Sequence, residues 1–147
     1  SEPAGVAAVF PTLAWAAYIA PRGIPAPGER PTAYIVVVRP AGGDRVAVAD
    51  AAAAVENILL TAVAEGLGGC WIGAVQRDVL AGILGIPAGF EIDSVIALGW
   101  PDEQPVAEAY SGNVKYWKDE QGVLHVPKRS LQDVIHYGYF GRKRPTR

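Results

Sequence analysis

A glycine-rich segment, Gly66-Leu67-Gly68-Gly69-Cys70-Trp71-Ile72-Gly73-Ala74, carries the strongest chemical signal in the sequence. At its end, Gly73-Ala74, no bulky side chain stands between the backbone and a neighbour. Glycine permits a close approach of the backbone to a ligand. A flat aromatic cofactor needs bare amides of this kind at the edge of its ring. The alternative meaning of the same residues is a plain strand end or bulge.

A second candidate site is the basic pair Lys128-Arg129, which comes directly before an expected helix start at Ser130. Two cations beside a helix N-terminus make a suitable phosphate site, because the free amides and the helix dipole add to the two charges. The alternative interpretation is a solvated basic pair. His125 is a further candidate contact of the same phosphate.

The remaining reactive side chains predict no further chemistry. Cys70 lies in an apolar strand, so we expect a buried structural thiol rather than a nucleophile. His125 and His136 lack metal-ligand spacing with Cys70 or with carboxylates, so no metal site is expected. His136 is predicted to be a surface residue of the last helix. We assign no catalytic side chain.

Hydrophobic periodicity predicts the elements that position these residues. The β-branched run at 33–39 is typical of a strand covered on both faces. The apolar residues of 48–65 recur at helical spacing, and Gly66 is a natural stop. An alternation of strands and helices predicts an α/β or α+β layered domain. In chain order we expect a helix at 12–19, a strand at 33–39, a helix at 48–65, a strand at 69–75, a helix at 77–84, a strand at 92–100, a polar irregular stretch at 103–122 and a helix at 130–137.

Size and composition are those of one globular domain over residues 1–147, with an irregular or helical opening segment at 1–32 and a basic tail at 138–147. The net charge of −2 gives no reason to expect nucleic acid or an anionic membrane as a partner. We expect no apolar run long enough to span a bilayer, and a poor match to a signal peptide. A cytoplasmic location is the default expectation.

The helix at 48–65 also predicts an assembly. Ala51, Ala52, Ala53 and Ala54 stand beside Val55 and Ile58, so apolar residues lie on more than one face. A helix that is apolar nearly all round must be buried on all sides, and one sheet face cannot do that. A second subunit is therefore expected.

Four ordered pieces of sequence resemble the FMN-dependent nitroreductase family: GLGGCWIGA, a short helix ending in LGIP, VIALGWP and VPKRSL. The resemblance runs from about Phe10 to Ile135. It implies an α+β fold, a three-layer α/β/α sheet flanked by helices, built as an intertwined homodimer with flavins at the subunit interface. It also implies hydride transfer from NAD(P)H to FMN and then to a nitroaromatic, quinone or similar small-molecule electron acceptor.

The resemblance assigns residues to the cofactor. FMN would lie on the strand that carries Gly69, Cys70, Ile72, Gly73 and Ala74. Gly73 and Ala74 would be backbone partners of the flavin N5 and O4 edge. Lys128 and Arg129 would contact the phosphate.

The sequence departs from the family at its beginning. Family members start with an Arg-Arg-Ser-x-Arg type motif for the FMN phosphate and a Ser-x-x-Asn-x-Gln-Pro type segment along the ring, and neither occurs here. The expectation is therefore an N-terminally truncated member. Two alternatives to an active oxidoreductase follow: a non-catalytic dimeric flavin-binding or interaction module, and a fragment of a normal enzyme.

Overall fold

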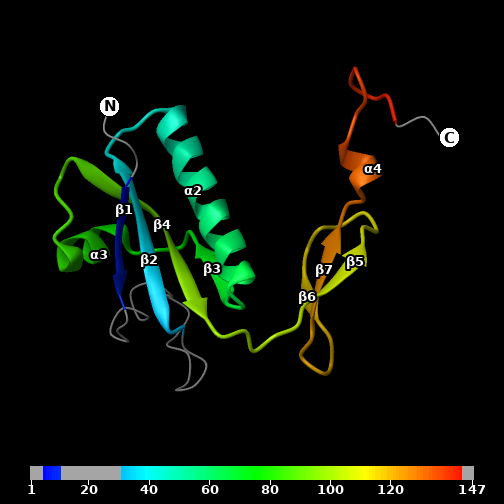
Figure 1. Ribbon diagram of the computed structural model, residues 1–147, viewed down its shortest axis with the longest axis horizontal. Helices are drawn as coiled ribbons and strands as arrows, with labels where there is room; N and C mark the ends of the chain where they lie inside the picture. The colour runs from blue at the N-terminus through cyan, green and yellow to red at the C-terminus, as the bar shows by residue number, and fades with distance from the viewer. Residues whose placement is uncertain (1–4, 11–30, 144–147) are drawn as a thin grey trace. The chain divides into compact units, whose positions relative to one another are not determined.

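The computed structural model describes residues 5–10 and 31–143. The chain divides into two compact units, Ser1–Pro101 and Asp102–Arg147 (Figure 1). The single domain expected over 1–147 stays a prediction.

The first unit is built on a four-stranded antiparallel sheet in the order β1-β2-β4-β3. Its central strands are buried on both faces, since Val36 and Val37 point to opposite sides and are each 1% exposed. The predicted strand at 33–39 is confirmed, and so is its coverage on both faces. The strands are β1 (Gly5–Phe10), β2 (Ala33–Pro40), β3 (Gly68–Ile72) and β4 (Phe90–Gly99).

Helix α2 (Arg45–Ala64) covers one face of this sheet. Asp44 caps its start, because the carboxylate accepts hydrogen bonds from the N–H groups of Val46 and Ala47 at 2.9 and 3.1 Å. Ala51 and Val55 are fully buried in the core cluster that includes residues of β2 and β4. The predicted helix is confirmed, and the cap explains why it begins three residues earlier than expected.

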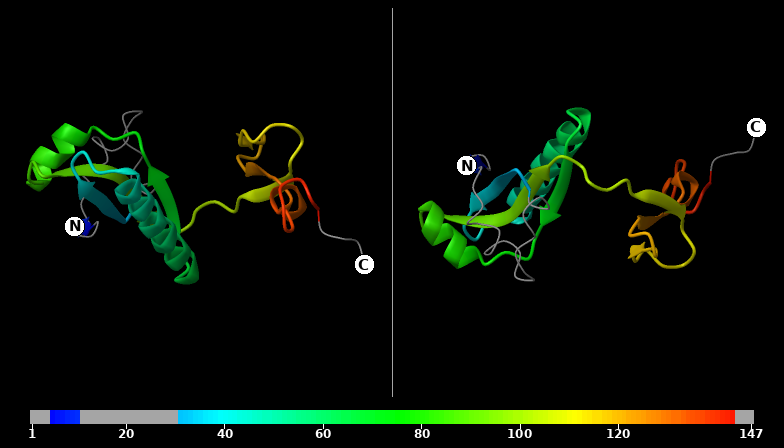
Figure 2. Two further views of the ribbon diagram at one scale, coloured as in Figure 1. Left: turned by 90° about the horizontal axis from the view of Figure 1, so that it is seen from above. Right: turned by 90° about the horizontal axis from the view of Figure 1, so that it is seen from below.

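Helix α3 (Arg77–Leu84) covers the other face, as the two views of Figure 2 show. Leu80 is fully buried in a cluster with Val36 and Val95. Gly85 ends the helix in the left-handed conformation, with φ of 65°. Helix, sheet and helix form three layers, so the predicted α/β/α arrangement and the α+β class are confirmed.

The expectation that no apolar run reaches bilayer length was wrong for α2. This helix has 20 residues and an 18-residue window with a mean hydropathy of 1.7. The core helix of a layered domain can have the same length and hydropathy as a membrane-spanning helix. Ala51, Val55 and Ala62 of α2 are buried in the first unit.

The second unit holds a small three-stranded sheet in the order β5-β7-β6. Strand β5 is parallel to β7, and β6 is antiparallel to it. These strands are too short to show periodicity, which is why 103–122 was predicted as irregular and β7 was missed. The expected helix at 130–137 has only four residues. The elements are β5 (Val106–Ala109), β6 (Trp117–Lys118), β7 (Leu124–Lys128) and α4 (Leu131–Val134).

The opening segment differs from the expectation in one part. Gly5–Phe10 forms β1, although an irregular or helical segment was predicted over 1–32. It pairs with β2 from Gly5 opposite Val38 to Phe10 opposite Tyr34. The helix predicted at 12–19 lies outside the described residues.

Candidate functional site

The peptide between Gly73 and Ala74 is open and exposed at the end of β3. A Cβ built on Gly73 would meet no heavy atom within 4 Å. Within the described part of the chain, the N–H of Ala74 donates to no other group. Backbone N–H groups are strong donors. This stretch therefore offers an uncovered amide to which a planar acceptor edge has room to approach.

The guanidinium of Arg77 holds the other side of the same peptide. Its Nη2 donates to the Gly73 carbonyl at 3.0 Å, and the Val75 N–H donates to that oxygen at 3.1 Å. Sequence reasoning missed Arg77. A usable signal was present, because a cation in the first turn of a helix opposes the helix dipole and so points to another role for the side chain.

Gly69 is explained by packing rather than by openness. A Cβ at this position would lie 2.6 Å from Cδ2 of Leu59 on α2 and 3.4 Å from Cδ2 of Leu98 on β4. The glycine therefore lets α2 lie close to β3. Its predicted role in cofactor binding stays a prediction.

Cys70 is exposed, so the expectation of a buried thiol was wrong. The reason is topological: β3 is an edge strand of the described sheet, and Trp71 beside Cys70 is also 45% exposed. Ile72 is half-buried and packs on the core cluster that contains Leu80. The predicted cofactor contacts of Cys70 and Ile72 remain predictions.

Lys128 and Arg129 are exposed residues of the second unit. The Lys128 carbonyl accepts from the Tyr110 N–H at 3.0 Å, and the Arg129 guanidinium lies 5.6 Å from the centre of the Tyr110 ring. A cation at this distance from an aromatic face is attracted to it. The pair is thus held against β5 and its continuation, with both charged ends in solvent.

The helix start beside this pair already has its own carboxylate. The Ser130 hydroxyl donates to Asp133 Oδ2 at 2.7 Å and accepts from the Asp133 N–H at 3.2 Å. These bonds, together with the charges of Lys143 and Arg129, lower the pKa of Asp133. The helix has only four residues, so the two side-chain charges are the main attraction that this position offers to an anion. The phosphate site at Lys128 and Arg129 stays a prediction.

His125 binds two carboxylates of its own unit. Its Nδ1 lies 2.7 Å from Glu108 Oε1 and its Nε2 lies 3.2 Å from Asp119 Oδ2. The hydrogen bond with Asp119, and then that with Glu108, raises the pKa of His125 against the opposing effect of burial. Hydrogen bonds from the Val123 N–H and from His125 lower the pKa of Asp119. This imidazole is a structural link between β7 and its neighbours.

His136 was expected on the surface of the last helix, and this expectation was wrong. The residue comes after α4, which ends at Val134. It is half-buried, its ring stacks on Phe140 with centroids 4.4 Å apart, and Nδ1 accepts from the Gly141 N–H at 2.6 Å. Among the residues that the structure describes, no group of three His, Cys, Asp or Glu side chains could hold a metal ion.

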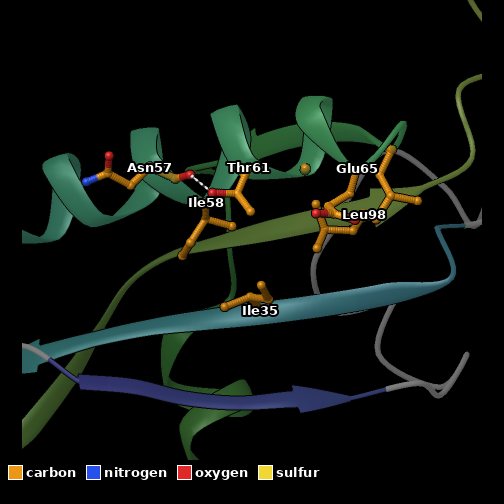
Figure 3. A pocket seen from close by; sticks show the side chains of 8 residues that line it. Ile35, Asn57, Ile58, Thr61, Glu65 and Leu98 are labelled. Carbon is orange, nitrogen blue, oxygen red and sulfur yellow. Dashed lines mark hydrogen bonds between the residues drawn. The ribbon is translucent and has the colours of Figure 1, made fainter.

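An open apolar hollow of about 390 Å³ lies between α2 and the sheet (Figure 3). Ile58 faces it from α2, and Ile35 and Leu98 face it from β2 and β4. The Thr61 hydroxyl donates to the Asn57 carbonyl at 2.8 Å at its rim. None of the site residues predicted from sequence lines this hollow. The other lining residues are Ala62, Glu65 and Leu67.

The predicted site residues therefore fall into two groups. Gly69, Cys70, Ile72, Gly73 and Ala74 lie together along β3 and its end, whereas Lys128 and Arg129 belong to the second unit.

The arrangement of β2, α2, β3, α3 and β4 covers the part of the chain that matches a known family. The model of the nitroreductase family matches residues 9–100. The chain belongs to the nitroreductase family.

One relative matches over a shorter stretch of the chain. A candidate NADH dehydrogenase/NAD(P)H nitroreductase of Archaeoglobus fulgidus is 43% identical over 67 residues, which is 42% of this nitroreductase-family chain and 38% of that protein. The chain thus covers well under half of this relative's length.

Two solved nitroreductase structures share the fold over most of the chain. A candidate NADH dehydrogenase/NAD(P)H nitroreductase of Bacteroides thetaiotaomicron superposes with a TM-score of 0.62 and 22% identity, covering 94% of this chain and 73% of that one. An FMN-dependent nitroreductase of Clostridium difficile gives 0.60 and 19%, covering 90% and 74%. At these identities the likeness establishes the fold.

Proposed function

We propose that this chain is an FMN-dependent oxidoreductase that moves hydride from NAD(P)H through bound FMN to a nitroaromatic, quinone or similar small-molecule acceptor. FMN, when bound, accepts the hydride and passes it on. The observation that carries the proposal is the open Gly73–Ala74 peptide after β3, in a chain of the nitroreductase family. The names of the relatives, which include FMN and NAD(P)H, support the choice of cofactor and donor.

In this proposal the backbone after β3 binds the reacting edge of the ring. The amides of Gly73 and Ala74 would bind the N5 and O4 edge of the ring, and Gly69, Cys70 and Ile72 would supply the strand on which the ring lies. An amide fixed in place before the reaction stabilises charge that develops at this edge. No side chain needs to act as acid or base, because solvent can supply the proton.

The phosphate of FMN would bind Lys128 and Arg129. Both side chains are exposed and cationic, and a phosphate accepts charge-assisted hydrogen bonds from such groups.

The proposed assembly is a homodimer, and a cytoplasmic location goes with it. Helix α2 leaves large apolar side chains in solvent: Leu60 is 60% exposed and Val63 is 69% exposed. Val46 and Val48, at the start of the same helix, are exposed as well. Exposed apolar side chains of this kind support association with a second subunit.

Flavin titration of the purified chain tests the proposal. We expect saturable FMN binding, bleaching of the flavin absorbance by NADH or NADPH without oxygen, and recovery of that absorbance on adding a quinone or nitroaromatic. Bleaching without recovery on any acceptor would contradict the acceptor class. Failure to bind FMN would contradict the function.

A second candidate function is a non-catalytic dimeric flavin-binding or interaction module of the same family. The exposed apolar surface of α2 favours it, because that surface suits association whether or not hydride is moved. A dimer that binds FMN tightly but is not reduced by either nucleotide would support this candidate over the first.

A further inference from the structure

We propose that Arg77 is a positioning residue for the Gly73–Ala74 peptide, and that it sets how strongly the Ala74 N–H binds the flavin edge. The inference rests on the proposed function, because it takes the flavin to lie against this peptide. Arg77 is the first residue of α3, and its Nη2 reaches back to the Gly73 carbonyl at 3.0 Å.

The geometry of one peptide unit links the two groups. A trans peptide is planar, with its C=O and N–H pointing in opposite directions, and the described chain has no cis peptide bonds. Gly73 has no Cβ and would otherwise sample many backbone conformations. Its carbonyl is held by Arg77 and by the Val75 N–H at 3.1 Å. Fixing that oxygen fixes the direction of the Ala74 N–H, away from the guanidinium.

Arg77 also ties this peptide to the central strand of the sheet. Its Nε donates to the Ile92 carbonyl at 2.9 Å, and Nη2 donates to the Asp93 carbonyl at 2.8 Å. The β3–β4 ladder ends where Ile72 pairs with Val95, so these carbonyls lie just beyond it. The guanidinium therefore continues the pairing of β4 after β3 has ended. Only a planar fork of several donors can bind three carbonyls in this way.

The charge of Arg77 acts through the same hydrogen bond. A cation bound to a carbonyl polarises the amide, and linked hydrogen bonds strengthen one another. The Ala74 N–H thereby becomes a stronger donor. A stronger donor at the flavin edge favours the electron-rich reduced ring over the oxidised ring. Arg77 thus raises the reduction potential of bound FMN.

Arg77→Gln in the full chain tests this role, with Arg39→Gln as the matched control. Arg39 binds the carboxylates of Glu91 and Asp93 on the same strand, at 2.5 and 3.3 Å, without touching Gly73. For R77Q we expect reduced FMN to bind about tenfold more weakly relative to oxidised FMN, a fall of about 30 mV in the two-electron midpoint potential. In flavin-free protein the NMR resonance of the Ala74 amide should shift in R77Q. Both quantities should match wild type in R39Q.

The outcomes separate this inference from the proposed function. Binding of FMN by R77Q with the wild-type potential and an unmoved Ala74 resonance would overturn the role of Arg77 alone. Failure of the wild-type chain to bind FMN would overturn the proposed function and this role with it. If R77Q does not fold, Arg77→Lys carries the comparison. The lysine keeps the positive charge but not the planar fork of donors, so we expect reduced FMN to bind about threefold more weakly relative to oxidised FMN. An unchanged ratio would overturn the role of Arg77.

Discussion

The indole of Trp117 lies flat on the imidazole of His125, with ring centroids 4.2 Å apart and planes 14° from parallel. The same indole donates from Nε1 to Glu108 Oε2 at 3.2 Å, while Glu108 Oε1 faces His125 Nδ1. An aromatic face and two carboxylates all favour the charged imidazolium. Three short strands of the second unit are thus linked through one titrating ring.

The stability of the second unit should fall as pH rises above about 6.5. The pKa of His125 is raised in the folded chain, so its contribution is fully present below the unfolded pKa and is lost as pH rises through the folded pKa. The lowered pKa of Asp119 acts in the opposite direction, and its contribution is lost in acid. NMR titration of the His125 imidazole, together with unfolding curves at several pH values, checks this. His125→Gln should flatten the alkaline loss of stability. A folded-state His125 pKa at or below the ordinary value would count against the linkage.

Substitution of Gly69 should weaken the packing of α2 on β3. The missing Cβ would lie 2.6 Å from Leu59 Cδ2, so Gly69→Val forces that side chain and the helix to shift. Overpacking of this kind costs about 1–3 kcal/mol of unfolding free energy. Gly82→Ala is the control, because it adds a Cβ in open space within α3 and should stabilise by about 0.5–1 kcal/mol. Denaturant unfolding gives both values, and equal stability of the two variants would contradict the packing argument.

The sequence predicted the elements with long apolar patterns and missed those held by local contacts. The run around Val36 and the repeat of α2 predicted two elements well, because their burial leaves a period in the sequence. Strands β5 and β6 are too short for a period, and β7 follows a turn fixed by Asp119 side-chain hydrogen bonds to the N–H groups of Gln121 and Val123.

The candidate site was predictable to a similar degree. The sequence predicted that no bulky side chain stands over the Gly73–Ala74 peptide, and the open space around Gly73 agrees with that part of the prediction. The contact between Arg77 and the carbonyl of Gly73 depends on where β4 places Ile92 and Asp93, which are far away in sequence. The exposure of Cys70 likewise depends on the order of the strands, and no local pattern reports that order.

Gly73→Val should hinder flavin binding while leaving the fold intact. The new side chain would occupy the open space over the strand end, where nothing lies within 4 Å of the Cβ position. A steric cost of about 1–3 kcal/mol corresponds to about 5- to 150-fold weaker FMN binding. Gly89→Val is the matched control, because its added side chain also enters open space but lies away from β3. We expect this variant to keep the wild-type affinity for FMN. Unchanged FMN affinity in Gly73→Val would mean that the flavin lies elsewhere.

The double change Lys128→Ala and Arg129→Ala should weaken FMN binding but spare riboflavin, which has no phosphate. Both cations are exposed, so each contributes near the lower end of the range for charged hydrogen bonds, about 1.5 kcal/mol, or about a hundredfold together. Binding of FMN should also weaken as salt rises. Lys115→Ala, an exposed lysine of the same unit, is the control. Equal losses for both flavins would indicate damaged folding, and full retention of FMN would place the phosphate elsewhere.

Charges on the outer face of α2 should dissociate the proposed dimer. Leu60 and Val63 are exposed in the single chain, and burying each in an interface contributes about 1.5–3 kcal/mol. Leu60→Lys with Val63→Glu should therefore raise the dimer dissociation constant at least about a hundredfold. Val79→Lys on α3, also exposed in the single chain, should not. Sedimentation at micromolar concentration measures both, and a monomeric wild-type chain would rule out the dimer.

The order of the strands in the sheet determines when the core can be completed during synthesis. Strand β2 pairs with β1 on one side, but its other neighbour is β4, with Ala33 opposite Leu98 and Pro40 opposite Phe90. While the chain is being made, β2 and α2 emerge before the strand that completes their core. Non-local pairings of this kind slow folding, because the intervening loop must close before any contact compensates for its lost entropy. Val36 and Val37 therefore stay exposed until β4 has been synthesised, and this interval is when a chaperone has most to protect.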